Sequence, residues 1–313
     1  MAVDMQAVDR VIGQRLSSDV LLINQISHYI VSAGGKRIRP RLVLLFSEAL
    51  GFAGPERFEL AAAVEFIHTA TLLHDDVVDE SSLRRGRQTV NALFGNAASV
   101  LVGDFLYSRA FQMMVGVNRM HVLEILADAT NVIAEGEVLQ LMNMHNAELD
   151  EAGYLAVVRS KTAKLFEASA RVGAILAGAS PELEAACAQY GQALGTAFQV
   201  IDDVLDYAGD AEVMGQSLGD DLREGKNTLP LIAAMQRGTP AQKAVIQSAL
   251  ETGSTDLLDQ VIDIVTTTGA LEFSRHAAAQ EARRAIAFAQ ALATGPYTNC
   301  LLSLAEQLLD RDI

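Results

Sequence analysis

The sequence has little that would crosslink a small secreted domain or anchor a chain in a membrane. It contains two cysteines, Cys187 and Cys300, too few for a disulfide framework or a cysteine metal site, and we expect them to be reduced, buried thiols of a cytoplasmic protein. No stretch approaches about 18 consecutive strongly apolar residues, so no transmembrane helix is expected. Residues 1–10 carry Asp4 and Asp9 and lack a basic-then-apolar layout, which argues against a secretory signal.

Basic residues are also scarce. Lys and Arg number 24 against 39 Asp and Glu, which gives a formal net charge of −15. A general nucleic-acid binder would need a basic surface, and docking on anionic lipid would need a local basic patch that overrides this mean. Half of the 313 residues are nonetheless apolar, which excludes wholesale disorder. We expect one domain over residues 1–313, because no break has the composition of a linker.

Only six prolines interrupt the chain, and long stretches between them repeat apolar residues at three- and four-residue spacing. This is the period of a helix rather than the alternation of a strand, and no convincing strand or hairpin signal is present. The stretches with this pattern are 60–78, 97–115, 119–144, 160–178, 182–207 and 268–293. Several are apolar around most of their circumference, as is typical of helices at the centre of a large bundle or around a cavity. The sequence therefore predicts an all-α fold whose successive helices are mostly antiparallel neighbours.

Two acidic clusters lie within these apolar stretches. Residues 74–79 read HDDVVD and residues 202–206 read DDVLD, so each contains the pattern DDxxD. On a helix the first and last aspartates share a face, where like charges repel and unpaired buried carboxylates are costly. The carboxylates therefore need a compensating cation. Their oxygen ligands suit Mg²⁺, which commonly takes one or two carboxylates together with substrate phosphates and water. A merely solvated acidic surface is the alternative, but it would be expected to have polar rather than apolar flanks.

Basic residues are grouped near these clusters in the sequence. Residues 34–40 read GGKRIRP, residues 83–87 read LRRGR and residues 219–226 read GDDLREGK, while Lys161-Thr162 is expected to open another helix. Glycines let backbone N–H groups approach an anion, and Lys and Arg supply charge-assisted hydrogen bonds to phosphate. Any one group could be ordinary surface charge. Together with the carboxylates they indicate a metal-diphosphate site that has no Walker loop.

These motifs together resemble the trans-isoprenyl diphosphate synthases. The segments that carry the resemblance are GGKRIRP, LLHDDVVDESSLRRG, GDFLYSRAF, KTAKLF, FQVIDDVLDY and GDDLREGKNTLPL. They occur in the family's order from about residue 20 to the C-terminus, and the chain looks most similar to the bacterial long-chain all-trans synthases, the octaprenyl diphosphate synthases above all. One departure is Asn227, which stands where many members have Pro or Arg.

The resemblance implies a single-domain orthogonal helical bundle, the isoprenoid synthase fold, around a deep central cavity with the two DDxxD motifs facing each other across its mouth. It implies a Mg²⁺-dependent prenyltransferase that adds isopentenyl diphosphate repeatedly to an allylic diphosphate such as farnesyl diphosphate. It further implies a cytoplasmic homodimer.

The resemblance also assigns roles to residues at matching positions. Three Mg²⁺ ions are expected, with Asp75 and Asp79 as ligands of two and Asp202 as ligand of the third. The carboxylates expected behind these ligands are Asp76, Asp203, Asp206 and Asp220. Isopentenyl diphosphate would be bound by Lys36, Arg39, His68 and Arg85. The allylic diphosphate would be bound by Arg84, Lys161, Thr162, Gln199 and Lys226, with Thr162 also placing an oxygen near the developing carbocation. The catalytic set is Asp75, Asp76, Asp79, Lys161, Thr162, Asp202 and Asp203.

Product length is expected to depend on the residues one turn before the first acidic cluster. In short-chain members of the family bulky aromatic residues close the pocket there, whereas this chain has Ala70 and Thr71. The resemblance therefore implies an open channel toward Met113, Met114 and Leu126, although these methionines could equally be gap-filling core. The expected product has about eight isoprene units, from a channel several helical turns deep. Such a chain would serve quinone side-chain synthesis.

Other functions agree less well with the same residues. A short- or medium-chain synthase, making farnesyl or geranylgeranyl diphosphate, is the nearest alternative and is disfavoured by Ala70 and Thr71. A terpene cyclase would not need a second DDxxD, and a non-catalytic subunit of a heteromeric synthase could have lost a cluster that this chain retains. A purely structural helical scaffold would not retain six carboxylates on apolar helices. His74 has no expected role beyond structure.

Overall fold

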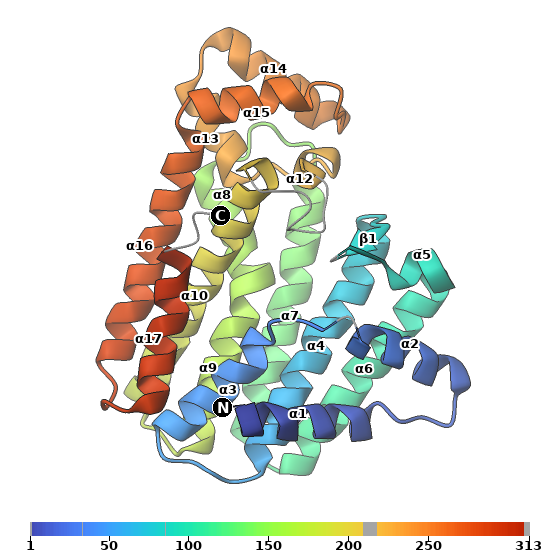
Figure 1. Ribbon diagram of the computed structural model, residues 1–313, viewed down its shortest axis with the longest axis vertical. Helices are drawn as coiled ribbons and strands as arrows, with labels where there is room; N and C mark the ends of the chain where they lie inside the picture. Colours follow the sequence, from blue (N-terminus) through green and yellow to red (C-terminus); the bar gives the residue numbers. More distant parts are fainter. Residues whose placement is uncertain (1, 33, 85, 209–217, 310–313) are drawn as a thin grey trace. The chain divides into compact units, whose positions relative to one another are not determined.

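The computed structural model describes residues 2–32, 34–84, 86–208 and 218–309, and the regular secondary structure of these residues is almost entirely helical (Figure 1). The chain divides into two compact units. Unit 1 comprises Met1–Thr130, Leu165–Gly191 and Gln290–Leu301, and unit 2 comprises Asn131–Lys164, Gln192–Ala289 and Leu302–Ile313. The prediction of one domain over the whole chain stays a prediction.

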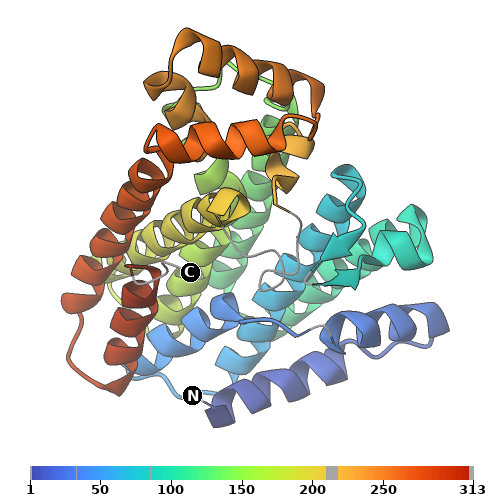
Figure 2. The same cartoon turned by 45° about the horizontal axis from the view of Figure 1, so that its top comes forward.

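Unit 1 is built around a pair of long helices. Its helices, some of which continue into unit 2, are α1 (Ala2–Arg15), α2 (Leu21–Ser32), α3 (Ile38–Ala49), α4 (Glu56–Val78), α5 (Val90–Phe94), α6 (Asn96–Val117), α7 (Met120–Met142), α9 (Lys164–Leu176) and α10 (Pro181–Ala208). Helix α4 lies alongside α6 (Figure 1 and Figure 2). Leu60 and Ile67 of α4 are fully buried, and Phe46 of α3 meets Tyr190 of α10 edge to face with ring centroids 5.2 Å apart. The buried residues of α4 fix the helix whose C-terminal end carries the first acidic cluster.

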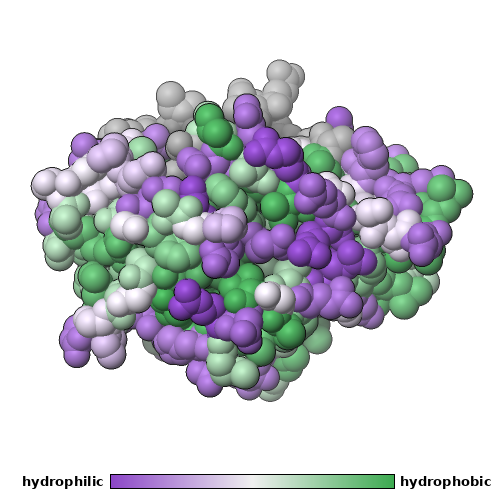
Figure 3. All heavy atoms as spheres, turned by 90° about the horizontal axis from the view of Figure 1, so that it is seen from below, coloured by the Kyte–Doolittle hydropathy of each residue, from purple (hydrophilic) through white to green (hydrophobic). Residues whose placement is uncertain are grey.

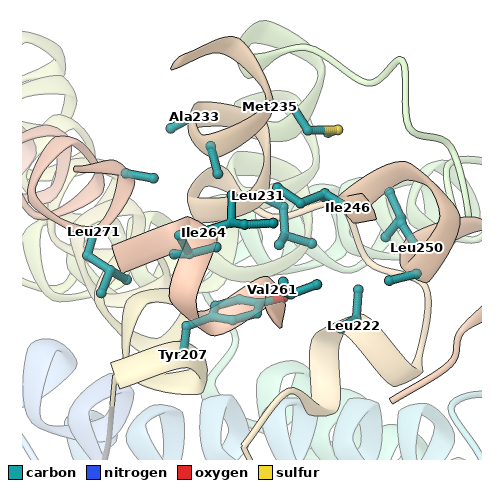
Figure 4. Close-up of a cluster of buried hydrophobic side chains, with 14 of the residues drawn as sticks. Tyr207, Leu222, Leu231, Ala233, Met235, Ile246, Leu250, Val261, Ile264 and Leu271 are labelled. Carbon is teal, nitrogen blue, oxygen red and sulfur yellow. The ribbon is translucent and has the colours of Figure 1, made fainter. Parts of the chain in front are cut away.

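Unit 2 holds the second acidic cluster on the last turns of α10. It also contains α8 (Glu151–Val158), the π-helical turn η1 (Arg159–Ala163), α12 (Asp220–Arg223), α13 (Leu229–Arg237), α14 (Pro240–Thr252), α15 (Leu258–Thr267), most of α16 (Ala270–Gln290) and the end of α17 (Pro296–Leu309). A buried cluster joins Tyr207 of α10 to Leu222 of α12, Leu231 of α13, Leu250 of α14 and Val261 of α15 (Figure 4). The aspartates of α10 therefore precede a residue, Tyr207, that is fixed by four other helices.

The predicted all-α character is confirmed, and each predicted helical stretch coincides with an observed one to within a few residues. The expectation of no strands was wrong in one place, because β1 (Leu83–Arg84) pairs antiparallel with β2 (Arg87–Gln88). Strands of two residues are too short to show alternation in a sequence, although Gly86, with φ of 71°, is typical of a tight turn. Lys161 and Thr162 were also expected to open a helix, and instead lie within η1, between α8 and α9.

Surface features bear on the remaining expectations. Cys187 is buried, as expected, but Cys300 is exposed. Across the described parts of the chain, no helix combines the length and apolarity needed to cross a bilayer. Figure 3 shows hydrophobic and hydrophilic residues interspersed on one face, and the strongly exposed apolar side chains of unit 1 include Leu101 (67% exposed) and Val115 (61%) on α6.

Candidate active site

The first acidic cluster lies at the C-terminal end of α4, with Asp75 and Asp76 in its last turn and Asp79 as its C-cap. Asp75 and Asp79 are partly exposed, and the N–H of Asp79 donates to the carbonyl of Asp75 at 2.8 Å as the helix ends. Asp76 is only 3% exposed and accepts two hydrogen bonds from the Arg84 guanidinium, at 2.6 and 2.9 Å. Burial raises the pKa of Asp76 in spite of this cation. Asp76 thus ties the end of α4 to the β1–β2 hairpin, while Asp75 and Asp79 share the more open side of the turn.

The residues expected to bind isopentenyl diphosphate are brought together in part. Arg39 Nη1 lies 3.1 Å from His68 Nε2, and the Arg39 guanidinium stacks over the Phe166 ring at 4.4 Å. Because a guanidinium can only donate, Nε2 of His68 accepts this bond and the ring proton is assigned to Nδ1. Lys36 is exposed just before α3, and Arg85 lies outside the described residues.

A cavity of about 110 Å³ lies beside these groups in unit 1. Its lining combines apolar side chains such as Phe66, Leu72 and Leu106 with the polar residues His68, Asp76, Arg84 and Arg87. An apolar space with a cationic border suits a small hydrocarbon that carries a diphosphate.

Of the residues expected to line the product channel, all but the partly exposed Thr71 lie in the interior of unit 1. Ala70, Met113, Met114 and Leu126 are each at most 2% exposed. The hydroxyl of Thr71 donates to the carbonyl of His68 at 2.8 Å. The small side chain of Ala70 is therefore packed against its neighbours, and an open channel at this level stays a prediction.

A second cavity, of about 130 Å³, lies in unit 2. It gathers five residues that were expected to act on the allylic diphosphate or to support the metal, from η1, from α10 and from the connection before α13. They are Lys161, Thr162, Gln199, Asp203 and Lys226. Their spacing along the chain does not place them together, so their meeting is a result of the fold.

A chain of hydrogen bonds crosses this cavity. The hydroxyl of Thr162 donates to Gln199 Oε1 at 3.0 Å, and Gln199 Nε2 donates to Asp203 Oδ1 at 2.7 Å, one helical turn further along α10. The buried hydroxyl of Tyr154 donates to the other oxygen of Asp203. Burial raises the pKa of Asp203 to about 6, and these two donors with Lys226 oppose the rise.

Both lysines at the cavity are held by carboxylates. Lys161 Nζ lies 2.7 Å from Glu137 of α7, and Lys226 Nζ lies 2.6 Å from Glu224. The Asn227 amide donates to the carbonyl of Asn146 at 3.1 Å. This bond secures the residue after Lys226 to the α7–α8 connection and gives a physical reason for the unusual Asn227.

The remaining carboxylates of the second cluster have distinct surroundings. Asp206 accepts the backbone N–H groups of Asp220 at 3.1 Å and of Asp221 at 3.2 Å, so it caps the short helix α12. Burial raises the pKa of Asp206 to about 7. Asp220 pairs with Arg223 at 2.8 Å, and Asp202 is partly exposed. Asp206 therefore positions the segment that contains Asp220.

The donor chemistry suits Mg²⁺, although the protein alone does not complete a site. Within the described ranges no three His, Cys, Asp or Glu side chains come together as ligands of one ion. Mg²⁺ characteristically takes one or two carboxylates and completes its shell with phosphate and water. The partly exposed Asp75, Asp79 and Asp202 fit that pattern better than a closed, all-protein cage.

Some residues of the site carry no signal in the sequence. Tyr154 lies 49 positions before Asp203 in an unremarkable apolar helix, and Glu137 lies 24 positions before Lys161.

His74 is held by α6, where Nε2 lies 3.2 Å from the carbonyl of Val100 and the ring stacks on Tyr107. These contacts agree with the structural role expected for His74.

Comparison with known proteins places these features in a family. A family model described as polyprenyl synthetase matches residues 20–265. The octaprenyl diphosphate synthase of Escherichia coli (strain K12) is 54% identical over 312 residues, which cover 99% of this chain and 97% of that protein. The all-trans-nonaprenyl-diphosphate synthase (geranyl-diphosphate specific) of Rhodobacter capsulatus is 45% identical, with 99% and 96% covered.

Solved structures agree with these relatives. A polyprenyl synthase from Caulobacter crescentus CB15, complexed with calcium and isoprenyl diphosphate, has a TM-score of 0.96 at 43% identity, with 100% of this chain and 96% of that chain covered. The heptaprenyl diphosphate synthase of Staphylococcus aureus has a TM-score of 0.94 at 28% identity, with 100% and 98% covered. The resemblance, the isoprenoid synthase fold and the prediction of a trans-prenyltransferase are confirmed.

Proposed function

Because the chain belongs to the polyprenyl synthetase family, we propose that it adds isopentenyl diphosphate repeatedly to an allylic diphosphate and makes all-trans octaprenyl diphosphate. The observation that carries this proposal is the unit 2 cavity, where two lysines, Thr162 and the Gln199–Asp203 pair converge. The likeness to the E. coli octaprenyl diphosphate synthase supports a product of about eight isoprene units.

Charge explains the proposed roles at this cavity. Ionisation of an allylic C–O bond sends negative charge onto the departing diphosphate, and preorganised cations at that position stabilise it. At this cavity Lys161 and Lys226 would bind that group, and the oxygen of Thr162 would face the developing carbocation. Apolar walls would keep water from the cation until the isopentenyl double bond reaches it. Isopentenyl diphosphate would be bound by Lys36, Arg39, His68 and Arg85.

Metal ions belong to the same proposal. Asp75 and Asp79 would hold two Mg²⁺ ions and Asp202 a third, with Asp76, Asp203, Asp206 and Asp220 supporting them. Bound Mg²⁺ supplies positive charge that neutralises the diphosphate as it leaves. The hydrogen bonds on Asp203 and the backbone donors on Asp206 would keep these supporting carboxylates in fixed orientations.

Assembly and location complete the proposal. We propose a cytoplasmic homodimer of a single polyprenyl synthase domain, serving quinone side-chain synthesis. The exposed apolar residues Leu101, Phe111 and Val115 share one side of α6, which supports a protein–protein contact there.

The experiment is incubation of the full chain with Mg²⁺, isopentenyl diphosphate and farnesyl diphosphate, followed by chromatographic sizing of the products. The expected product has about eight isoprene units. A farnesyl or geranylgeranyl product would instead identify a short- or medium-chain synthase. No condensation by a folded, Mg²⁺-replete preparation would refute the enzyme, and condensation only after addition of a second protein would indicate a non-catalytic subunit.

A further inference from the structure

We propose that Gly136 and Glu137, consecutive residues of α7, are positioning residues that place Lys161 and Thr162 for binding of the allylic diphosphate. The proposal rests on the proposed function for the identity of the substrate. Neither residue lies in the sequence segments that carry the family resemblance, and both lie in unit 2 with the residues they contact.

Gly136 brings the backbone of α7 into contact with the backbone of η1. A Cβ atom at this position would lie 2.8 Å from Ser160 Cβ and 2.9 Å from the amide nitrogen of Lys161. These distances are shorter than carbon contacts allow, and one partner is backbone that cannot rotate away. Glycine in the interior of a helix is destabilising relative to alanine, so its presence here needs a packing reason. The close approach to Lys161 supplies that reason.

Glu137 acts on the other end of the same lysine. Its Oε2 lies 2.7 Å from Lys161 Nζ, and the two side chains are 28% and 17% exposed. A lysine has a flexible four-carbon stem and loses rotamer entropy when it is fixed. Gly136 locates the backbone of Lys161 while Glu137 locates its ammonium group, so both ends of the side chain are set by one helical turn of α7.

The contact between Gly136 and η1 also affects Thr162, which lies in the same π-helical turn. π-Helical turns are rare and are frequently found at functional sites. The backbone that Gly136 touches leads directly to Thr162, whose hydroxyl donates to Gln199. A displacement of η1 by α7 would therefore move both Lys161 and the Thr162–Gln199 hydrogen bond.

If Glu137 instead competed with the substrate for Lys161, its removal would strengthen substrate binding rather than weaken it. A carboxylate that only competed with diphosphate for Lys161 would weaken substrate binding, and its removal would tighten it. The backbone contact at Gly136 favours positioning, because simple competition for the ammonium group would not require α7 to touch the backbone of η1.

The test compares Glu137→Gln and Gly136→Ala with matched controls. Glu135→Gln removes the same charge from an exposed position of the same helix, and Gly13→Ala adds the same methyl group to α1 where nothing lies within 4 Å. Both test variants should raise KM for farnesyl diphosphate about ten- to a hundredfold, as expected for a misplaced binding group. KM for isopentenyl diphosphate should stay at the wild-type value, and both controls should behave as wild type.

Calorimetric binding of inorganic diphosphate with Mg²⁺ gives a readout that does not depend on turnover. Weaker binding by Glu137→Gln, with an unchanged melting temperature, supports the proposal even if wild-type protein condenses no substrate, an outcome that would count against the proposed function alone. Wild-type affinity in Glu137→Gln would overturn the proposal, as would tighter binding, which identifies competition. Glu137→Gln preserves side-chain size, so the test survives if Gly136→Ala fails to fold.

Discussion

Replacement of Tyr154 by phenylalanine probes the buried support of the second acidic cluster. The Tyr154 hydroxyl donates to Asp203, which is 3% exposed and also accepts from Gln199. The substitution removes one oxygen and leaves the ring, so it opens no large cavity. One oxygen of a buried carboxylate then loses its donor.

The loss in free energy of unfolding caused by Tyr154→Phe should depend on pH because Asp203 titrates. Burial raises the pKa of Asp203 to about 6 in the folded protein, above its ordinary value of 3.8. A carboxyl with a raised pKa favours the folded state at low pH, and that contribution is lost as the pH rises through the folded pKa. The Tyr154 hydrogen bond opposes this loss. Its removal should cost about 0.5–1.5 kcal/mol at pH 5, where the bond joins neutral groups, and about 1.5–3 kcal/mol at pH 8, where it reaches a carboxylate.

Urea unfolding of metal-free protein at the two pH values measures this difference. Tyr190→Phe is the matched control, since Tyr190 is equally buried and donates to the neutral carbonyl of Leu301. It should cost about 0.5–1.5 kcal/mol at both pH values and leave turnover unchanged. Tyr154→Phe should also lower kcat/KM about tenfold or more, as a lost support behind a metal ligand does. An equal cost at both pH values, with wild-type turnover, would refute the reasoning.

Three further predictions concern the rest of the molecule. Asp75→Ala should abolish condensation while circular dichroism shows retained folding; wild-type rates would remove the metal assignment. Ala70→Tyr should shorten the product on chromatography and, because Ala70 is fully buried, lower stability by about 1–3 kcal/mol; unchanged product length would exclude the channel there. The pKa of His121 is raised chiefly by its hydrogen bond to Glu184, whose own pKa is lowered by Arg171 and His121 although burial opposes this. This pair should stabilise the fold between about pH 4.5 and 6.5. His121→Gln should therefore lower the free energy of unfolding, measured with urea, by at most about 1 kcal/mol in that range and not at all at pH 9. A loss of stability that does not depend on pH would contradict the ion pair.

Local patterns in the sequence were sufficient to predict the long helices and part of the candidate site. The 3.6-residue period located the long helices, and the DDxxD spacing placed Asp75 and Asp79 on one helical turn as expected. These features depend only on residues close together in the chain. A period of two cannot show itself in strands of two residues, which is why the Leu83–Arg84 hairpin strand was missed.

Contacts between distant segments were not predictable in the same way. Nothing in the residues around Tyr154 indicates that its hydroxyl meets Asp203, and nothing around Glu137 indicates that it pairs with Lys161. The helical pattern around 160–178 likewise did not reveal the π-helical turn, because a single turn of five residues is too short to show a period of its own. Such contacts are fixed by tertiary packing, which a single sequence does not display.

The net charge of −15 and the anionic substrates are compatible because the charge is locally organised. At the unit 2 cavity each lysine lies beside a carboxylate, Lys161 with Glu137 and Lys226 with Glu224. Each pair contributes no net charge to the long-range field, so it adds nothing that would attract nucleic acid. At short range the ammonium groups can still bind a diphosphate that reaches them, especially with Mg²⁺ neutralising part of its charge. The mean charge of the chain thus describes which large partners it repels, while the ion pairs describe which small anions it can hold.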